Sequence, residues 1–276
     1  MSSRPNIRVL SHLANSIALG VLAAPLASGQ IGLALAPMRI ELRMTPGSRQ
    51  TGTLALSNDS SARIRVRAEA LDFYIDATGT PQFSREFPLE ASLSCRQWLS
   101  LNPMEMELEP GVQIMVRFSI DVPASTVDGG YHCGAGFTTM QVPTEPLKNG
   151  LRTAVRAVAV FYPVLGNPPI DGVLKSIKLE PVSDPQQGKY NVVVVMKNSG
   201  LTHFRPHGDV EVLDEAGKKV DSASFQPLPV LPNREQRFLF PMKTQLEKGS
   251  YTFHARVDIG TNEIQEAKVV LVTEQR

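Results

Sequence analysis

The stretch Leu151–Pro169 reads LRTAVRAVAVFYPVLGNPP and decides the fold. Its first twelve residues alternate as in a β-strand rich in valine, alanine and aromatic side chains, and from Ala157 onward both alternating faces are apolar. A strand has this pattern where both of its faces are covered. Before that point Arg152 and Arg156 share one face, so the early half meets water or a negatively charged partner. The strand ends in prolines around Gly166, which is typical of a domain boundary.

The residues before this strand are predicted to form a sandwich of short strands. Ala62–Ile75 alternates apolar residues with arginines, the pattern of a strand with one buried and one solvated face. Leu33–Met44 is interrupted by Pro37, which suits an edge strand or one that switches sheets. The second half, from Val173 to Val272, repeats this organisation of strands and turns. We therefore predict an all-β protein with two sandwich domains in tandem, over residues 30–165 and 166–276.

The first 29 residues have the pattern of a secretory signal peptide. A basic start is followed by the apolar run Ile17–Ala27, which is too short to span a bilayer as a mature helix, and small residues then precede Gln30. A buried N-terminal helix or an uncleaved anchor is the alternative, which Pro25 and the basic flank disfavour. No later run is apolar enough to span a membrane, so the mature chain is predicted to have no span.

Composition and motifs argue against several function classes. The net charge of +1 gives no support for a nucleic acid or an anionic membrane as the main partner. The sequence lacks the common catalytic, nucleotide-binding and metal-binding motifs. His203 and His207 are four residues apart, and Pro206 between them excludes an ordinary helix that would bring them together. They are therefore interpreted as exposed loop histidines. We predict no enzyme activity, no metal and no cofactor.

Two cysteines and one tyrosine refine the first domain. In an exported chain Cys95 and Cys133 can form a disulfide, whereas in a cytosolic chain two buried thiols are expected. Tyr131 lies two residues before Cys133, after two glycines, which is the tyrosine-corner arrangement of immunoglobulin-like sandwiches. The alternative for Tyr131 is an ordinary core tyrosine. Gly249-Ser250-Tyr251 resembles a second tyrosine corner, so both domains are predicted to be immunoglobulin-like β-sandwiches.

Between about Leu33 and Pro163 the sequence contains the segments Ala36–Ile40, Leu54–Asn58, Trp98–Pro103, Leu108–Arg117, Gly129–Tyr131 and Phe161–Pro163. In their order and spacing, these segments resemble the periplasmic pilus-assembly chaperones of the chaperone–usher pathway. These chaperones have two immunoglobulin-like domains arranged in an L, whereas the second half of this chain is similar to a generic bacterial surface domain. The resemblance implies a periplasmic chaperone that binds a pilin-like or secreted subunit, with an outer-membrane usher as a further partner.

The resemblance also implies where a client would bind. In the family, the last strand of the first domain completes the fold of a subunit that lacks a strand. Two basic residues hold the C-terminal carboxylate of the client, and Arg39 matches the first of them. The second is a lysine in the family, and Arg152 or Arg156 is the nearest basic residue here, which is a departure. The client-pairing residues would be Leu151, Thr153, Val155 and Ala157.

The alternative function is a structural or adhesive cell-surface module. Such a module would bind a protein or a glycan through its loops, because a sandwich fold alone does not specify function.

Overall fold

The computed structural model describes residues 32–76, 78–140, 154–182 and 190–273. Leu151, Arg152, Thr153 and the predicted signal peptide lie outside the described residues. Within them the chain forms strands and turns, with two short 3-10 helices, η1 (Pro88–Leu93) and η2 (Arg96–Trp98). The predicted all-β fold class is confirmed, and no helix of the described part is long and apolar enough to cross a membrane.

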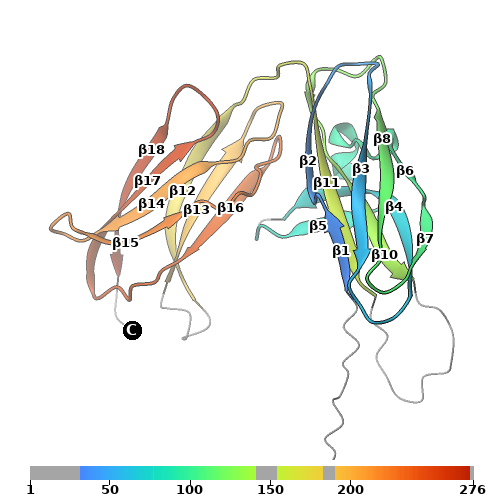
Figure 1. The fold of residues 1–276 in the computed structure, drawn as a ribbon. Helices are drawn as coiled ribbons and strands as arrows, with labels where there is room; N and C mark the ends of the chain where they lie inside the picture. The colour runs from blue at the N-terminus through green and yellow to red at the C-terminus, as the bar shows by residue number, and fades with distance from the viewer. Residues whose placement is uncertain (1–31, 77, 141–153, 183–189, 274–276) are drawn as a thin grey trace, which may run out of the picture.

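The first sandwich consists of two sheets built from residues 33–165 (Figure 1). The chain switches between them at Pro37, because the strand before it pairs with one sheet and the strand after it with the other. One sheet has the order β1 (Leu33–Ala36), β3 (Arg49–Asn58), β8 (Gln113–Asp121) and β6 (Leu99–Asn102). The other has the order β2 (Arg39–Met44), β11 (Arg156–Leu165), β10 (Cys133–Met140), β4 (Ile64–Ile75) and β5 (Pro81–Ser84), with β7 (Glu105–Leu108) beside β4 and β9 (Gly129–Gly130) beside β11.

The second sandwich is built from residues 172–273, and no strand of the described chain joins a sheet of one sandwich to a sheet of the other. Its apolar core includes the fully buried Phe238 and Phe253. The sheets have the orders β12 (Gly172–Pro181), β13 (Tyr190–Asn198), β16 (Glu235–Pro241) and β15 (Lys219–Ser224), β14 (His207–Leu213), β17 (Gly249–Asp258), β18 (Gln265–Thr273).

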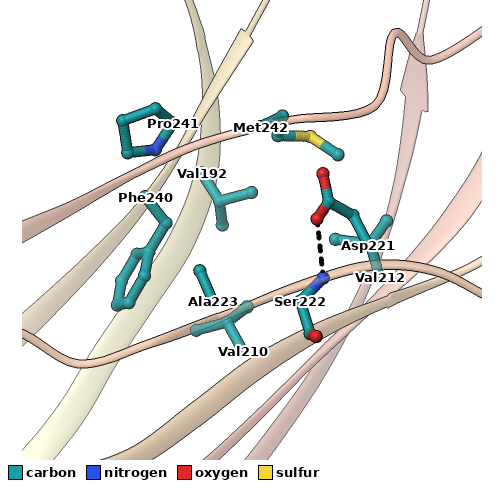
Figure 2. Close-up of a pocket in the computed structure, with 9 residues that line it drawn as sticks. All are labelled: Val192, Val210, Val212, Asp221, Ser222, Ala223, Phe240, Pro241 and Met242. Carbon is teal, nitrogen blue, oxygen red and sulfur yellow. Dashed lines mark hydrogen bonds between the residues drawn. The ribbon is translucent and has the colours of Figure 1, made fainter.

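A small pocket in this second sandwich is a packing gap rather than a ligand site. Figure 2 shows Val192, Val210 and Phe240 around it, with the Asp221 carboxylate accepting a hydrogen bond from the Ser222 backbone N–H at 2.7 Å. The same carboxylate accepts hydrogen bonds from the backbone of the turn that follows β16. The pocket has a volume of about 10 Å³, which leaves room for one water at most.

Strand β11 is buried on both faces, as its sequence predicts. Ala159 and Phe161 point into the core of the first sandwich, where they are fully buried. Tyr162 points to the opposite side and joins a separate apolar cluster that includes Phe73. The strand therefore separates two apolar regions, and only the second of them reaches the other sandwich.

The loop end of the first sandwich is held by the two features that the cysteines and Tyr131 suggest. Cys95 and Cys133 form a disulfide with their Cα atoms 5.2 Å apart. The Tyr131 hydroxyl donates a hydrogen bond to the carbonyl oxygen of Val127 at 2.9 Å, which is the tyrosine-corner contact. The Tyr131 ring packs on Trp98 with the ring centroids 4.6 Å apart.

His132, next to the disulfide, is expected to make stability depend on pH. The side chain is buried, and burial lowers the pKa of His132 to about 4, although the negative charge of Asp72 acts in the opposite direction. Because the folded pKa lies below the unfolded one, the unfolded chain takes up the proton first, and stability falls as the pH drops from about 6.5 to about 4. The loss is about 3 kcal/mol from this group.

Chemical denaturation of wild type and His132→Gln between pH 7 and pH 4 checks this expectation. The variant should lose clearly less stability than wild type over that range. Equal losses in the two proteins would mean that His132 is not the group responsible.

Candidate binding site at the β11 edge and between the sandwiches

One edge of β11 is only partly covered. Strand β2 pairs with it in parallel from Val160 to Leu165, and the Val160 N–H donates to the carbonyl oxygen of Met38 at 2.9 Å. Backbone groups of successive strand residues point to alternate sides, so those of Arg156 and Val158 point to the same side as those of Val160. No strand of the described chain pairs with β11 on that side before Val160. Strand β1, which pairs with β3, lies close to β11 without pairing with it. The early half of β11 therefore presents an edge without a strand partner, called here the open edge and defined as residues 154–159.

The side chains at the open edge are fixed by the rest of the sandwich. Val155 is half-buried, and its N–H donates to the Thr139 hydroxyl at 2.9 Å on the β10 side. Ala157 packs against the core of the first sandwich. Arg156 is exposed and forms an ion pair with Glu69 at 3.2 Å. The backbone of this edge is therefore ordered by its contacts before any partner binds.

Arg39 and Arg156 do not come together. Arg39 is paired with Val160 in the register of β2 and β11, and Arg156 lies four residues earlier in β11. At about 3.3 Å per residue the two positions are roughly 13 Å apart along the strand. Arg156 also has Glu69 as its partner. Arg39 therefore remains the predicted first anchor, and Arg152 or Arg156 remains the predicted second one.

Glu41 follows Arg39 on the same face of β2 and connects the two sandwiches. Its carboxylate accepts hydrogen bonds from the Arg205 guanidinium, with Nη2 at 3.1 Å and Nε at 3.4 Å from Oε1. Its other oxygen lies 3.0 Å from His203 Nε2. The Arg39 Nε atom is 3.9 Å from Oε1. Three groups that can carry positive charge thus surround one carboxylate, two of them from the second sandwich.

The electrostatics of this cluster follow from the contacts. Partial burial by itself would raise the pKa of Glu41, but the hydrogen bond and charge of His203 and the charge of Arg205 outweigh it, so the pKa lies below its usual value. Burial raises the pKa of the Tyr162 phenol, against the opposing charge of Arg205. Glu41 is therefore ionised at neutral pH and Tyr162 is neutral.

Tyr162 provides the surface on which the second sandwich packs. The Arg205 guanidinium carbon lies 4.8 Å from the centre of the Tyr162 ring, in cation–π geometry. The His203 ring is 4.7 Å from the same ring. Arg205 Nη1 also donates to the carbonyl oxygen of Pro227 at 2.9 Å, so Arg205 is held from several sides.

Further contacts fix the two sandwiches relative to one another. Leu231 of the second sandwich is buried in the apolar cluster with Phe73 and Tyr162. The Gly130 N–H donates to the carbonyl oxygen of Leu201 at 2.7 Å. Figure 1 shows β2, β11 and β5 on the side of the first sandwich that is turned toward the second. A cavity of about 340 Å³ remains between them, and Arg43 and His203 are among its lining residues.

No protein-family sequence model matches the chain, and no curated protein sequence matches it either. Solved structures do match. The E. coli chaperone DraB covers 87% of this chain and 98% of its own, with 14% identity and a TM-score of 0.43. The CsuC–CsuE chaperone–tip adhesion subunit pre-assembly complex of Acinetobacter baumannii covers 86% and 97%, with 10% identity and a TM-score of 0.43. The Pseudomonas aeruginosa CupB2 chaperone covers 87% and 100%, with 15% identity and a TM-score of 0.40.

The chain resembles fimbrial chaperones. The likeness is one of fold.

Several residues of this site were missed from the sequence. Glu41 and Arg205 are separated by more than 160 positions, and no motif connects them. The prediction that His203 is an exposed loop histidine is wrong, because its side chain is only 10% exposed. The apolar neighbours of Tyr162 in the sequence indicate burial but do not indicate which surface covers the ring. Among the described residues, no group of side chains has a metal-binding arrangement.

Gly130 tests how closely the sandwiches must approach. A Cβ atom at this position would lie 2.7 Å from the Thr202 hydroxyl oxygen and 2.8 Å from the Thr202 Cα atom. A Cβ atom at the neighbouring Gly129 would meet nothing closer than 3.5 Å. Gly130→Ala is therefore expected to separate the sandwiches at this point, and Gly129→Ala is not. Small-angle X-ray scattering should show a changed profile for the first variant alone; two profiles identical to wild type would mean that this contact does not set the arrangement.

Proposed function

We propose that this chain is an exported chaperone-like protein that binds a pilin-like or other secreted subunit by β-strand addition, without catalysing a reaction. The observation that carries the proposal is the open edge of β11, residues 154–159. The proposal includes removal of residues 1–29 as a signal peptide, a periplasmic location and two domains spanning residues 30–165 and 166–276. An outer-membrane usher is its second proposed partner.

The open edge suits a client that lacks a strand. The backbone N–H and C=O groups of Arg156 and Val158 point toward it, and a client strand would pair with them through main-chain hydrogen bonds. Because the edge is already ordered by β10 and the core, binding costs little conformational entropy on the chaperone side. Alternate side chains at Leu151, Thr153, Val155 and Ala157 would then contact the client, although the first two lie outside the described residues.

Arg39 is proposed to hold the C-terminal carboxylate of the client. Its side chain is 53% exposed, and its contact with Glu41 is a long one at 3.9 Å. An arginine fork can grip a carboxylate through two hydrogen bonds and stays charged at any ordinary pH. Arg39 is also next to Val160, where β2 takes over the edge, so a client strand that ends there would bring its terminus to this residue.

Blocking the open edge should abolish strand addition. Arg156→Pro removes an N–H that points to the edge and is not needed by the β10 pairing, whereas Arg156→Ala removes the same side chain and keeps the N–H. The probe is an N-acetylated synthetic peptide of alternating valine and threonine residues, and binding is measured by isothermal titration calorimetry. The proline variant should bind at least tenfold more weakly than the alanine variant, with a similar thermal midpoint. Equal binding by the two variants would show that the edge is not used.

The carboxylate contact is tested with the same peptide and its C-terminally amidated form. Wild type should prefer the free acid by about tenfold, because a charge-assisted hydrogen bond in a partly desolvated site contributes about that much. Arg39→Gln should remove this preference while leaving the affinity for the amide unchanged. A preference that survives in Arg39→Gln would place the anchor at another residue.

A further inference from the structure

The proposed anchor at Arg39 has a negative charge beside it. The Glu41 side chain is 43% exposed, and its Oε1 atom is 3.9 Å from Arg39 Nε. A client carboxylate that binds Arg39 would therefore come within a few ångströms of Glu41. Two like charges at that separation repel, by an amount that corresponds to a severalfold loss of affinity in water and more at a partly buried site. Arg39 can serve as an anchor only if the charge of Glu41 is balanced by other groups.

The balancing groups come from the second sandwich. Arg205 donates two hydrogen bonds to Glu41 Oε1, and His203 contacts Oε2. The side chains of Arg205 and His203 are only 14% and 10% exposed, so neither can bind a client directly. Arg205 is fixed in addition by Tyr162 and by the Pro227 carbonyl oxygen. Both residues are thus committed to Glu41.

We propose that Arg205 and His203 are positioning residues: Arg205 neutralises Glu41 from the second sandwich, His203 holds the second oxygen of the same carboxylate, and Arg39 is thereby left free to hold a client's C-terminal carboxylate. This inference rests on the proposed function. It assigns the second sandwich a role in client affinity that requires no contact between that sandwich and the client. The chain then recognises an anionic terminus only while the two sandwiches are packed together at Glu41.

A purely mechanical role for Arg205 would have different consequences. If Arg205 only held the sandwiches together, its loss would weaken the binding of acid and amide peptides alike. If it neutralises Glu41, its loss should weaken only the acid, and removal of the Glu41 charge should repair the defect. The measured quantity is therefore the ratio of the dissociation constants of the amidated and free-acid peptides, called here the carboxylate preference.

The experiment compares Arg205→Gln, Glu41→Gln and the double variant with wild type. Arg205→Gln should lower the carboxylate preference from about tenfold to about threefold or less, with unchanged affinity for the amide. Glu41→Gln should keep or raise the preference, and the double variant should restore it to at least the wild-type value. Arg234→Gln is the matched control, because Arg234 stacks over Tyr74 at 5.8 Å between the sandwiches but is not a partner of Glu41. Its preference should equal that of wild type.

Three results would overturn the inference. Equal loss of acid and amide binding in Arg205→Gln would reduce Arg205 to a structural contact. Failure of Glu41→Gln to restore the preference in the double variant would exclude charge balance as the cause. If Arg205→Gln does not fold, the test rests on Glu41→Gln alone. A carboxylate preference lower than that of wild type in Glu41→Gln would then contradict the inference. A wild type that binds both peptides equally would reject the Arg39 anchor itself, a failure that is distinct from the other three.

Discussion

The structure depends on one constraint on β11: both faces of the strand are buried, and half of one edge is open. Phe161 and Ala159 fill the core of the first sandwich, and Tyr162 on the opposite face meets the second. The strand cannot slip by one residue in its register, because a slip would move each of these two sets of apolar side chains to the opposite face. Its early half is held in an extended conformation by β10, with backbone groups of Arg156 and Val158 directed to the edge that β2 does not reach. A rigid strand with an unpaired edge is the requirement for adding a strand from another chain.

The contact between the sandwiches extends this constraint to the charged residues. Tyr162 belongs to the apolar cluster with Leu231 and also supports the Arg205 guanidinium. Arg205 in turn fixes Glu41, which lies next to Arg39 on β2. Packing, cation–π contact and ion pairing therefore act on the same few residues. The charge around Arg39 is set by how the sandwiches pack as much as by the sequence of β2.

The sequence was sufficient for features that depend on local pattern. The apolar alternation of β11, the switch at Pro37 and the tyrosine-corner spacing before Cys133 are each visible within a few residues. It was insufficient where distant segments meet. The arginines of β4 lie on a solvated face as the pattern predicts, but the pairing of Arg65 and Arg67 with Glu105 on β7 could not be predicted from it. The polar strand β15 lacks the apolar alternation that marks its neighbours and was not predicted. The position of Arg156 relative to Arg39 required the register of β2 with β11, which no local pattern contains.

The most direct test of strand addition is residue-resolved amide hydrogen exchange of β11, measured by NMR with and without the free-acid peptide. In the free protein the amides of Ala157 and Ala159, which point to β10, should exchange slowly, and those of Arg156 and Val158 should exchange fast. The peptide should slow the exchange of Arg156 and Val158 by at least tenfold and leave the other two unchanged. Slow exchange of Arg156 and Val158 without peptide, or no change on adding a peptide that binds, would contradict the account.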